Sequence, residues 1–132
     1  MKRHLMMLRD IQKLFKSARK QVSIVDAHVD DTIFELYLKY VHPNTKIKLL
    51  TETMHGLFRT VAERFKVQKQ NFEVKKVRNI HDRYLIIDGK IWAIGSSLNY
   101  AGTRPLYLIE LSERKRVLNM FENFWKTGEQ VV

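Results

Sequence analysis

The sequence contains no cysteine and no long apolar run. Without thiols, a disulfide framework and thiol-based catalysis are both excluded. No segment approaches the roughly 20 consecutive apolar residues that a membrane-spanning helix needs. The first residues alternate apolar with charged side chains, so they lack the unbroken apolar core of a secretory signal. We therefore expect a soluble, cytoplasmic protein with no transmembrane segment.

Internal repeats, low-complexity runs and interdomain linkers are also absent from the sequence. Its 132 residues suffice for one domain that buries a single core. The apolar fraction of 45% is ordinary for a globular protein. We expect a single domain over residues 1–132.

Positive charge is the strongest feature of the composition. The 24 Lys and Arg residues outnumber 14 Asp and Glu residues, which gives a net charge of +10. A basic excess of this size favours polyanions, and nucleic acid is the commonest soluble one. Two alternatives stay open: a surface that only solubilises the protein, and a surface that binds acidic phospholipid.

The first half of the sequence alternates predicted helices and strands. Apolar spacings of three and four predict a helix over residues 2–20, which either covers a sheet or lies on a membrane or anionic partner. Apolar, partly β-branched runs predict strands over 21–29 and 46–51. Helical spacing returns over 33–38 and 56–70. Alternation of this kind is typical of α/β proteins.

The second half contains mainly strands. We predict strands over 72–78 and 106–111, a hairpin within 80–97, and a closing helix that Ser112 and Glu113 cap. Together with the first half, this order predicts an α/β fold whose mixed β-sheet is covered by helices on both faces.

Polar residues follow the first two predicted strands. Asp26, Asp30 and Asp31 with His28 are either metal ligands or turn and capping residues. We favour turns and caps, because no wider ligand pattern accompanies them. Thr51, at the C-terminal end of the second strand, lies where α/β sheets bind ligands, as do Thr53 and His55 nearby; a helix cap is the alternative. We therefore predict no metal site.

The most informative stretch is the hairpin of residues 80–97. Asp88-Gly89 between two apolar runs predicts a tight turn between antiparallel strands. Along such a strand His81 and Arg83 project to one side, while Asp88, at odd spacing from His81, belongs to the turn. An imidazole that titrates near neutrality beside a planar, five-donor cation predicts a phosphodiester site.

Residues around the hairpin extend this prediction. Small residues and hydroxyls end the returning strand, and a cationic segment precedes the hairpin, where it is suited to backbone phosphates. Trp92, Tyr100 and Arg104 form either a stacking and phosphate-contacting surface or ordinary packing. The predicted substrate-binding residues are Thr51, Lys75, Arg78, Ser97, Asn99 and Arg104.

The string His81-x-Arg83-x4-Asp88 resembles the His-x-Lys-x4-Asp signature of the phospholipase D-like superfamily, whose members cleave phosphodiesters in lipids or nucleic acids. Gly95-Ser96 resembles the Gly-Ser pair that follows it. The resemblance covers nearly the whole chain and implies one phospholipase D-like half-domain.

The resemblance also implies roles for the catalytic candidates. His81 takes the place of the nucleophile or general acid, and Arg83 stands at the phosphate-binding lysine. Asp88 takes the supporting aspartate position, and Ser96 the small residue near the phosphate. Because one chain carries one motif, the resemblance implies a homodimer that uses neither a metal nor another cofactor.

Two hypotheses follow. The first is a metal-independent phosphodiesterase or nuclease that acts on nucleic acid through a phosphohistidine in a homodimeric site. The second is a degenerate module that binds nucleic acid or acidic phospholipid without turnover. The second is motivated by Arg83 in place of lysine and by Leu98 where the family has asparagine, with Asn99 one place later.

Overall fold

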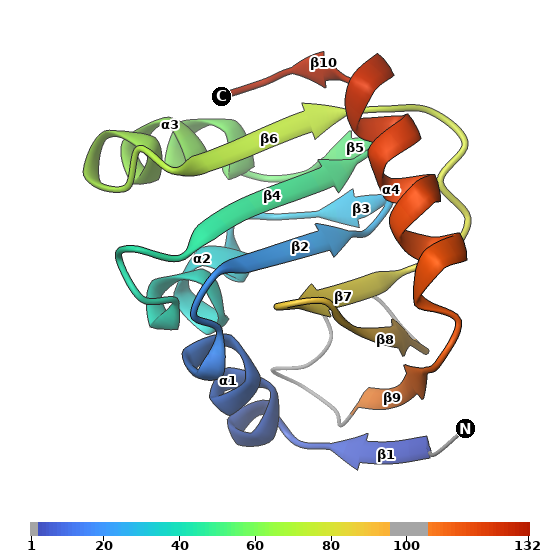
Figure 1. Ribbon diagram of the computed structural model, residues 1–132. Coiled ribbons are helices and arrows are strands. Elements are labelled where there is room, and N and C mark those ends of the chain that lie inside the picture. Colours follow the sequence, from blue (N-terminus) through green and yellow to red (C-terminus); the bar gives the residue numbers. More distant parts are fainter. Residues whose placement is uncertain (1–2, 96–105) are drawn as a thin grey trace.

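The computed structural model describes residues 3–95 and 106–132, and its centre is an eight-stranded mixed β-sheet (Figure 1). The strand order is β1-β9-β8-β7-β2-β4-β6-β10, in which the neighbours β2, β4 and β6 run parallel. All other neighbours pair antiparallel. The strands are β1 (Arg3–Met6), β2 (Gln21–Val25), β4 (Lys46–Thr51), β6 (Phe72–Lys76), β7 (Tyr84–Ile87), β8 (Lys90–Ile94), β9 (Leu106–Leu111) and β10 (Glu129–Gln130).

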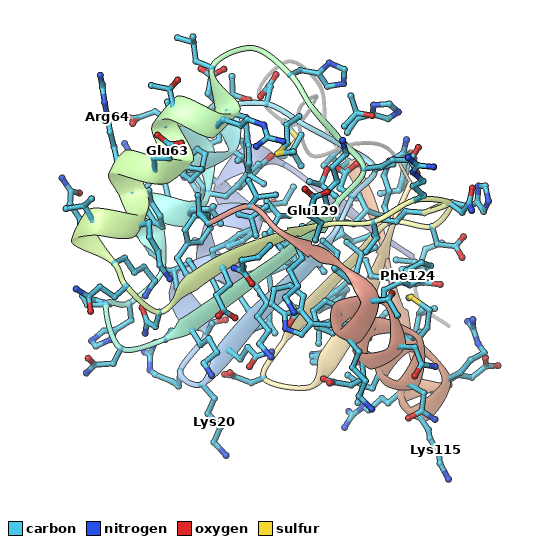
Figure 2. All side chains as sticks on the ribbon, turned by 90° about the horizontal axis from the view of Figure 1, so that it is seen from above. Lys20, Glu63, Arg64, Lys115, Phe124 and Glu129 are labelled. Atoms are coloured by element: carbon cyan, nitrogen blue, oxygen red, sulfur yellow. The ribbon has the colours of Figure 1, made fainter. Side chains whose placement is uncertain are left out.

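Helices cover both faces of this sheet, which confirms the predicted fold class. Helices α1, α2 and α3 pack on one face, and α4 crosses the other (Figure 1). Figure 2, seen from above, shows α3 and α4 on opposite sides of the strands. No helix among the described residues is long and apolar enough to cross a membrane. The helices are α1 (Leu8–Ser17), α2 (Thr32–Leu36), the 3₁₀ helix η1 (Leu38–Tyr40), α3 (Phe58–Gln68) and α4 (Arg114–Thr127).

The two faces are packed by alternate residues of the same strands. In β2, Ile24 lies in the core under the first three helices, whereas Val25 packs with Phe121 and Trp125 of α4. This is the two-residue period of a strand that is buried on both sides. Strand β7 is accordingly buried at all four of its residues.

The predicted helix over residues 2–20 is wrong at its start. Residues Arg3–Met6 form β1, which pairs antiparallel with β9 and places Leu5 opposite Tyr107. The helix begins only at Leu8, because the Asp10 carboxylate accepts the Met7 N–H at 3.1 Å. Sequence spacing could not show the pairing, since β1 and β9 lie at opposite ends of the chain.

The predicted strand over residues 21–29 is broken after Val25. The Asp26 carboxylate accepts the N–H of His28 at 3.1 Å, a turn that aspartate favours. The chain then forms β3 (His28–Val29), which pairs in parallel with β5 (Thr53–Met54) as a second, two-stranded sheet. The prediction also missed β10, a two-residue strand on β6.

The predicted hairpin is present but shorter. Asp88 and Gly89 join β7 to β8 with φ angles of 51° and 88°. Two positive φ angles are the turn geometry that Asp-Gly favours. The first strand begins at Tyr84 rather than at residue 80, so strand alternation does not govern how His81 and Arg83 project.

Candidate functional site

The polar residues of the site lie where the parallel strands end. Strands β2, β4 and β6 point toward the same edge of the sheet, and the connection from β6 to β7 runs along that edge (Figure 1). We name this the carboxyl edge; it comprises Asp26 and His28 after β2, Glu52 and His55 after β4, and residues 77–83. Ligands of open α/β sheets commonly bind at this end of the strands.

An ion pair joins β2 to the start of β7 at this edge. The Arg83 Nε atom lies 3.5 Å from Oδ1 of Asp26, whose side chain is 0% exposed. Arg83 Nε is itself buried and has no hydrogen-bond partner in the described part of the chain, so the Asp26 carboxylate serves as its counter-charge. The Arg83 side chain as a whole is 33% exposed. Its solvent contact therefore lies in atoms other than Nε, and the guanidinium is anchored at one end.

A second carboxylate fixes the connection that carries the motif. Glu52 Oε1 accepts the N–H of Asn79 at 2.7 Å and lies 3.4 Å from the N–H of Ile80. Asn79 has φ 65°, a left-handed conformation that asparagine tolerates better than most residues. This constrained backbone directly precedes His81, so Glu52 sets the path by which the chain reaches the histidine.

His81 is exposed and lines a cavity of about 220 Å³ between the connection and α4. Asp82 lines the same cavity, together with Arg116 from α4. His81 and Asp82 thus line one cavity although they are adjacent in sequence. The remaining lining residues are Val25, Asn79, Ile80, Tyr84, Met120 and Phe124; Phe124 is labelled in Figure 2.

Tyr84 forms part of the wall of this cavity. Burial raises the pKa of its hydroxyl, and the Asp82 carboxylate raises it further, while the Arg116 guanidinium acts in the opposite direction. Tyr84 is therefore a neutral hydrogen-bonding group near neutral pH. The cavity thus combines a titratable imidazole, a guanidinium, a carboxylate and a neutral phenol.

The motif aspartate lies at the other end of β7. Asp88 carboxylate oxygens accept the backbone N–H groups of Arg19, Lys20 and Gln21 at 2.8–2.9 Å. Burial acts to raise the pKa of Asp88, but these three hydrogen bonds outweigh it and the pKa is lowered. Asp88 lines a different cavity from His81. It therefore joins the hairpin turn to the start of β2, as its odd spacing predicts.

The other predicted binding residues differ in accessibility. Arg78 is exposed on the carboxyl edge. Thr51 is fully buried, and its hydroxyl donates to the Ala27 carbonyl at 3.4 Å. The Lys75 ammonium donates to the Trp125 carbonyl at 2.9 Å and so holds α4 against the sheet. Trp92 is buried, which agrees with packing. Ser96, Ser97, Asn99, Tyr100 and Arg104 lie outside the described residues.

Two carboxylates after β2 accept backbone N–H groups, in keeping with the favoured turn and capping interpretation, although Asp31 binds the start of α3 and makes no side-chain cap on α2. Asp30 accepts the Thr32 N–H at 2.9 Å, and Asp31 accepts the Leu57 N–H at 3.1 Å. No group of three or more potential metal ligands occurs among the residues that the structure describes.

Sequence reasoning missed the roles of Asp26, Glu52 and Arg116. A carboxylate directly after a buried strand is a usable signal for Asp26, but its partner Arg83 is distant in sequence. Arg116 gives no such signal, because it is one of several cations at the start of α4.

No family model and no curated protein matches this chain. Solved structures do, among them TrmBL2, described as an archaeal chromatin protein that shows a novel mode of DNA binding. That match has a TM-score of 0.62 and 14% identity over 98% of this chain and 54% of TrmBL2. NucT from Helicobacter pylori matches with a TM-score of 0.63 and 14% identity over 95% of this chain and 94% of NucT.

The phosphatidylserine synthase of Haemophilus influenzae Rd KW20 matches with a TM-score of 0.64 and 14% identity, over 92% of this chain and 36% of the synthase. This chain thus spans about half of TrmBL2 and about a third of the synthase, but nearly all of NucT. At this identity the likeness shows the fold alone. The chain has a phospholipase D-like fold.

Proposed function

We propose that the carboxyl edge binds the phosphates of nucleic acid and that His81 cleaves a phosphodiester there. The observation that carries this proposal is the buried Asp26, which anchors Arg83 on the same edge that exposes His81. A partly exposed guanidinium is suited to two oxygens of one phosphate. The net charge of +10 favours a polyanionic substrate.

A two-step exchange requires a second imidazole, and we assign it to a second copy of the chain in a two-fold homodimer. One His81 attacks phosphorus, and a P–N bond forms as the P–O bond breaks. The other His81 donates its proton to the leaving oxygen. Water then attacks the phosphohistidine, so that a new P–O bond forms as the P–N bond breaks, and it gives its proton to that second imidazole, which restores both histidines. No step passes through a metal ion or another cofactor.

A second candidate function is binding without turnover. It is favoured by the Asp26–Arg83 ion pair, because a guanidinium held by a carboxylate reaches a phosphate less freely than a lysine ammonium does. DNA binding, as described for TrmBL2, fits this function without any cleavage. Acidic phospholipid is the alternative ligand, since a phosphatidylserine synthase shares the fold.

The deciding experiment uses wild type, His81→Ala and His42→Ala with labelled single-stranded DNA, duplex DNA and RNA, in EDTA and at low salt. Binding and cleavage are measured on the same samples. His42 is a matched control, because it is also exposed but precedes the opposite, amino-terminal end of β4.

We expect products from wild type and His42→Ala and none from His81→Ala, which should still bind. Cleavage that persists in His81→Ala would contradict the catalytic assignment. Binding without products from any variant would support the second function, and anionic vesicles in the same assay identify a lipid ligand. Sedimentation of active wild type as a monomer would contradict the dimeric site.

A further inference from the structure

Two histidines outside the proposed chemistry are held together on the carboxyl edge. Strands β3 and β5 pair in parallel, and the backbone N–H of His55 donates to the Val29 carbonyl at 2.8 Å. The Thr53 N–H donates to the Ala27 carbonyl at 2.8 Å. These backbone bonds fix the segments that carry His28 and His55, so the two imidazoles are positioned before any ligand arrives.

The two rings approach each other through their nitrogens. Nδ1 of His28 lies 3.1 Å from Nε2 of His55, and the ring centroids are 5.3 Å apart. At this distance one nitrogen carries a proton and the other presents a lone pair to it. Both side chains are exposed. The pair therefore places two nitrogen donors next to each other on side chains that solvent reaches.

We propose that His28 and His55 together bind one divalent transition-metal ion of the imidazole-preferring class, represented by Zn²⁺. Zinc–nitrogen bonds of about 2.0–2.1 Å place two tetrahedral ligands roughly 3.4 Å apart. The observed separation of 3.1 Å is close to this value, so the ion replaces the shared proton once the rings turn to aim both lone pairs at it. Imidazole is a ligand that Zn²⁺, Cu²⁺ and Ni²⁺ favour over Mg²⁺.

The site leaves positions open on the ion. The acidic residues near the pair along the chain all have other partners: Asp26 pairs with Arg83, Glu52 accepts the Asn79 N–H, Asp30 the Thr32 N–H and Asp31 the Leu57 N–H. The structure describes no third histidine or carboxylate grouped with the pair. Two imidazoles fill two of the four positions of a tetrahedral ion, and water can occupy the others. If the proposed function holds, a phosphate oxygen of bound nucleic acid can replace such a water, but metal binding itself does not rest on that function.

The test is calorimetric titration of chelator-stripped wild type, His28→Ala, His55→Ala and His42→Ala with ZnCl₂ in a non-coordinating buffer, without nucleic acid. Even outer-sphere changes at metal sites weaken binding by about 10–100-fold, so loss of either direct ligand should cost at least about tenfold. His42→Ala should bind Zn²⁺ as wild type does. Thermal melts verify that each variant is folded, which is expected because both rings are exposed.

Two further readings sharpen the result. Cu²⁺ bound to wild type should show two equatorial nitrogens in its electron paramagnetic resonance spectrum, and fewer in either variant. Affinity for Zn²⁺ should fall as the pH is lowered from about 7.5 to about 5.5, because protons compete for the imidazoles. Equal Zn²⁺ affinity in wild type and in both variants would overturn the proposal. So would binding of Mg²⁺ as tight as that of Zn²⁺.

Discussion

The two ends of β7 each carry an aspartate contact, and the contacts differ in kind. At the carboxyl edge a buried carboxylate, Asp26, holds the guanidinium of Arg83. At the turn an exposed carboxylate, Asp88, holds three backbone N–H groups. The first contact positions a side chain that ligands can reach, whereas the second joins two segments of backbone. Of the three motif residues, His81 and Arg83 thus belong to the candidate site, whereas Asp88 belongs to the scaffold.

The largest effect expected from this division concerns cleavage. Loss of a nucleophile commonly lowers turnover by about 10⁴-fold or more, and we expect that for His81→Ala. Asp88→Asn should leave cleavage per folded molecule unchanged, because Asp88 lies at the other end of the strand. Single-turnover assays on both variants measure the difference. An equal loss of cleavage in both variants would contradict the assignment of Asp88 to the scaffold.

The next effect concerns stability at the carboxyl edge. Asp26→Asn keeps an acceptor for the His28 N–H but leaves Arg83 Nε buried without its counter-charge. Breaking a buried ion pair costs about 3–5 kcal/mol, and we expect about 2–3 kcal/mol because Arg83 is partly exposed. Urea denaturation provides the measurement.

Asp10→Asn is the matched control for that variant. Its carboxylate also accepts one backbone N–H, from Met7, but forms no ion pair with a cation among the residues that the structure describes. We expect a loss of at most about 1 kcal/mol for it. Equal losses for the two aspartates would show that the charge of Asp26 contributes nothing to folding.

A smaller effect is expected at the turn, and it depends on pH. The Asp88 pKa in the folded protein lies below its ordinary value of 3.8. Its stabilisation is therefore complete above that ordinary value and is lost as the pH falls through the lower, folded pKa. Asp88→Asn should cost about 1–2 kcal/mol at neutral pH. Urea midpoints measured from neutral pH to below 3.8 should fall less steeply in the variant than in wild type.

The smallest effect concerns salt dependence of nucleic-acid binding. Arg78 is exposed on the carboxyl edge, whereas Lys20 projects into solvent beside the turn (Figure 2). Loss of one phosphate contact lowers the slope of log affinity against log salt by about 0.7–0.9. We expect this for Arg78→Ala and no change for Lys20→Ala. Equal slopes for the two variants would place the phosphates elsewhere.

Much of the scaffold could be predicted from local pattern. The strand over Lys46–Thr51 and the strand over Leu106–Leu111 match their predicted bounds, because apolar runs identify buried strands directly. Asp88-Gly89 identified the turn. Strands β1 and β10 were missed, since each depends on a partner distant in sequence rather than on its own residues.

Less of the site could be predicted. The sequence singled out His81 and Arg83 for their chemistry, but it could not pair Arg83 with Asp26, because the fold alone brings these residues together. The same is true of the contact between His28 and His55. Placing Thr51 on a pocket rim followed from its position after a strand, yet its side chain points into the interior, where it is fully buried.

The Asp88 contact has a consequence for how such a chain can change over generations. Its acceptor bonds go to backbone N–H groups, which every residue except proline supplies, so residues 19–21 can vary in side chain without loss of the contact. The Asp88 contact is therefore insulated from side-chain substitutions in residues 19–21, and it shares no residue with the ion pair at the opposite end of β7. Related proteins can therefore differ in the ligand-contacting residues of the carboxyl edge, and hence in their chemistry, while they keep the same hairpin turn and its attachment to β2.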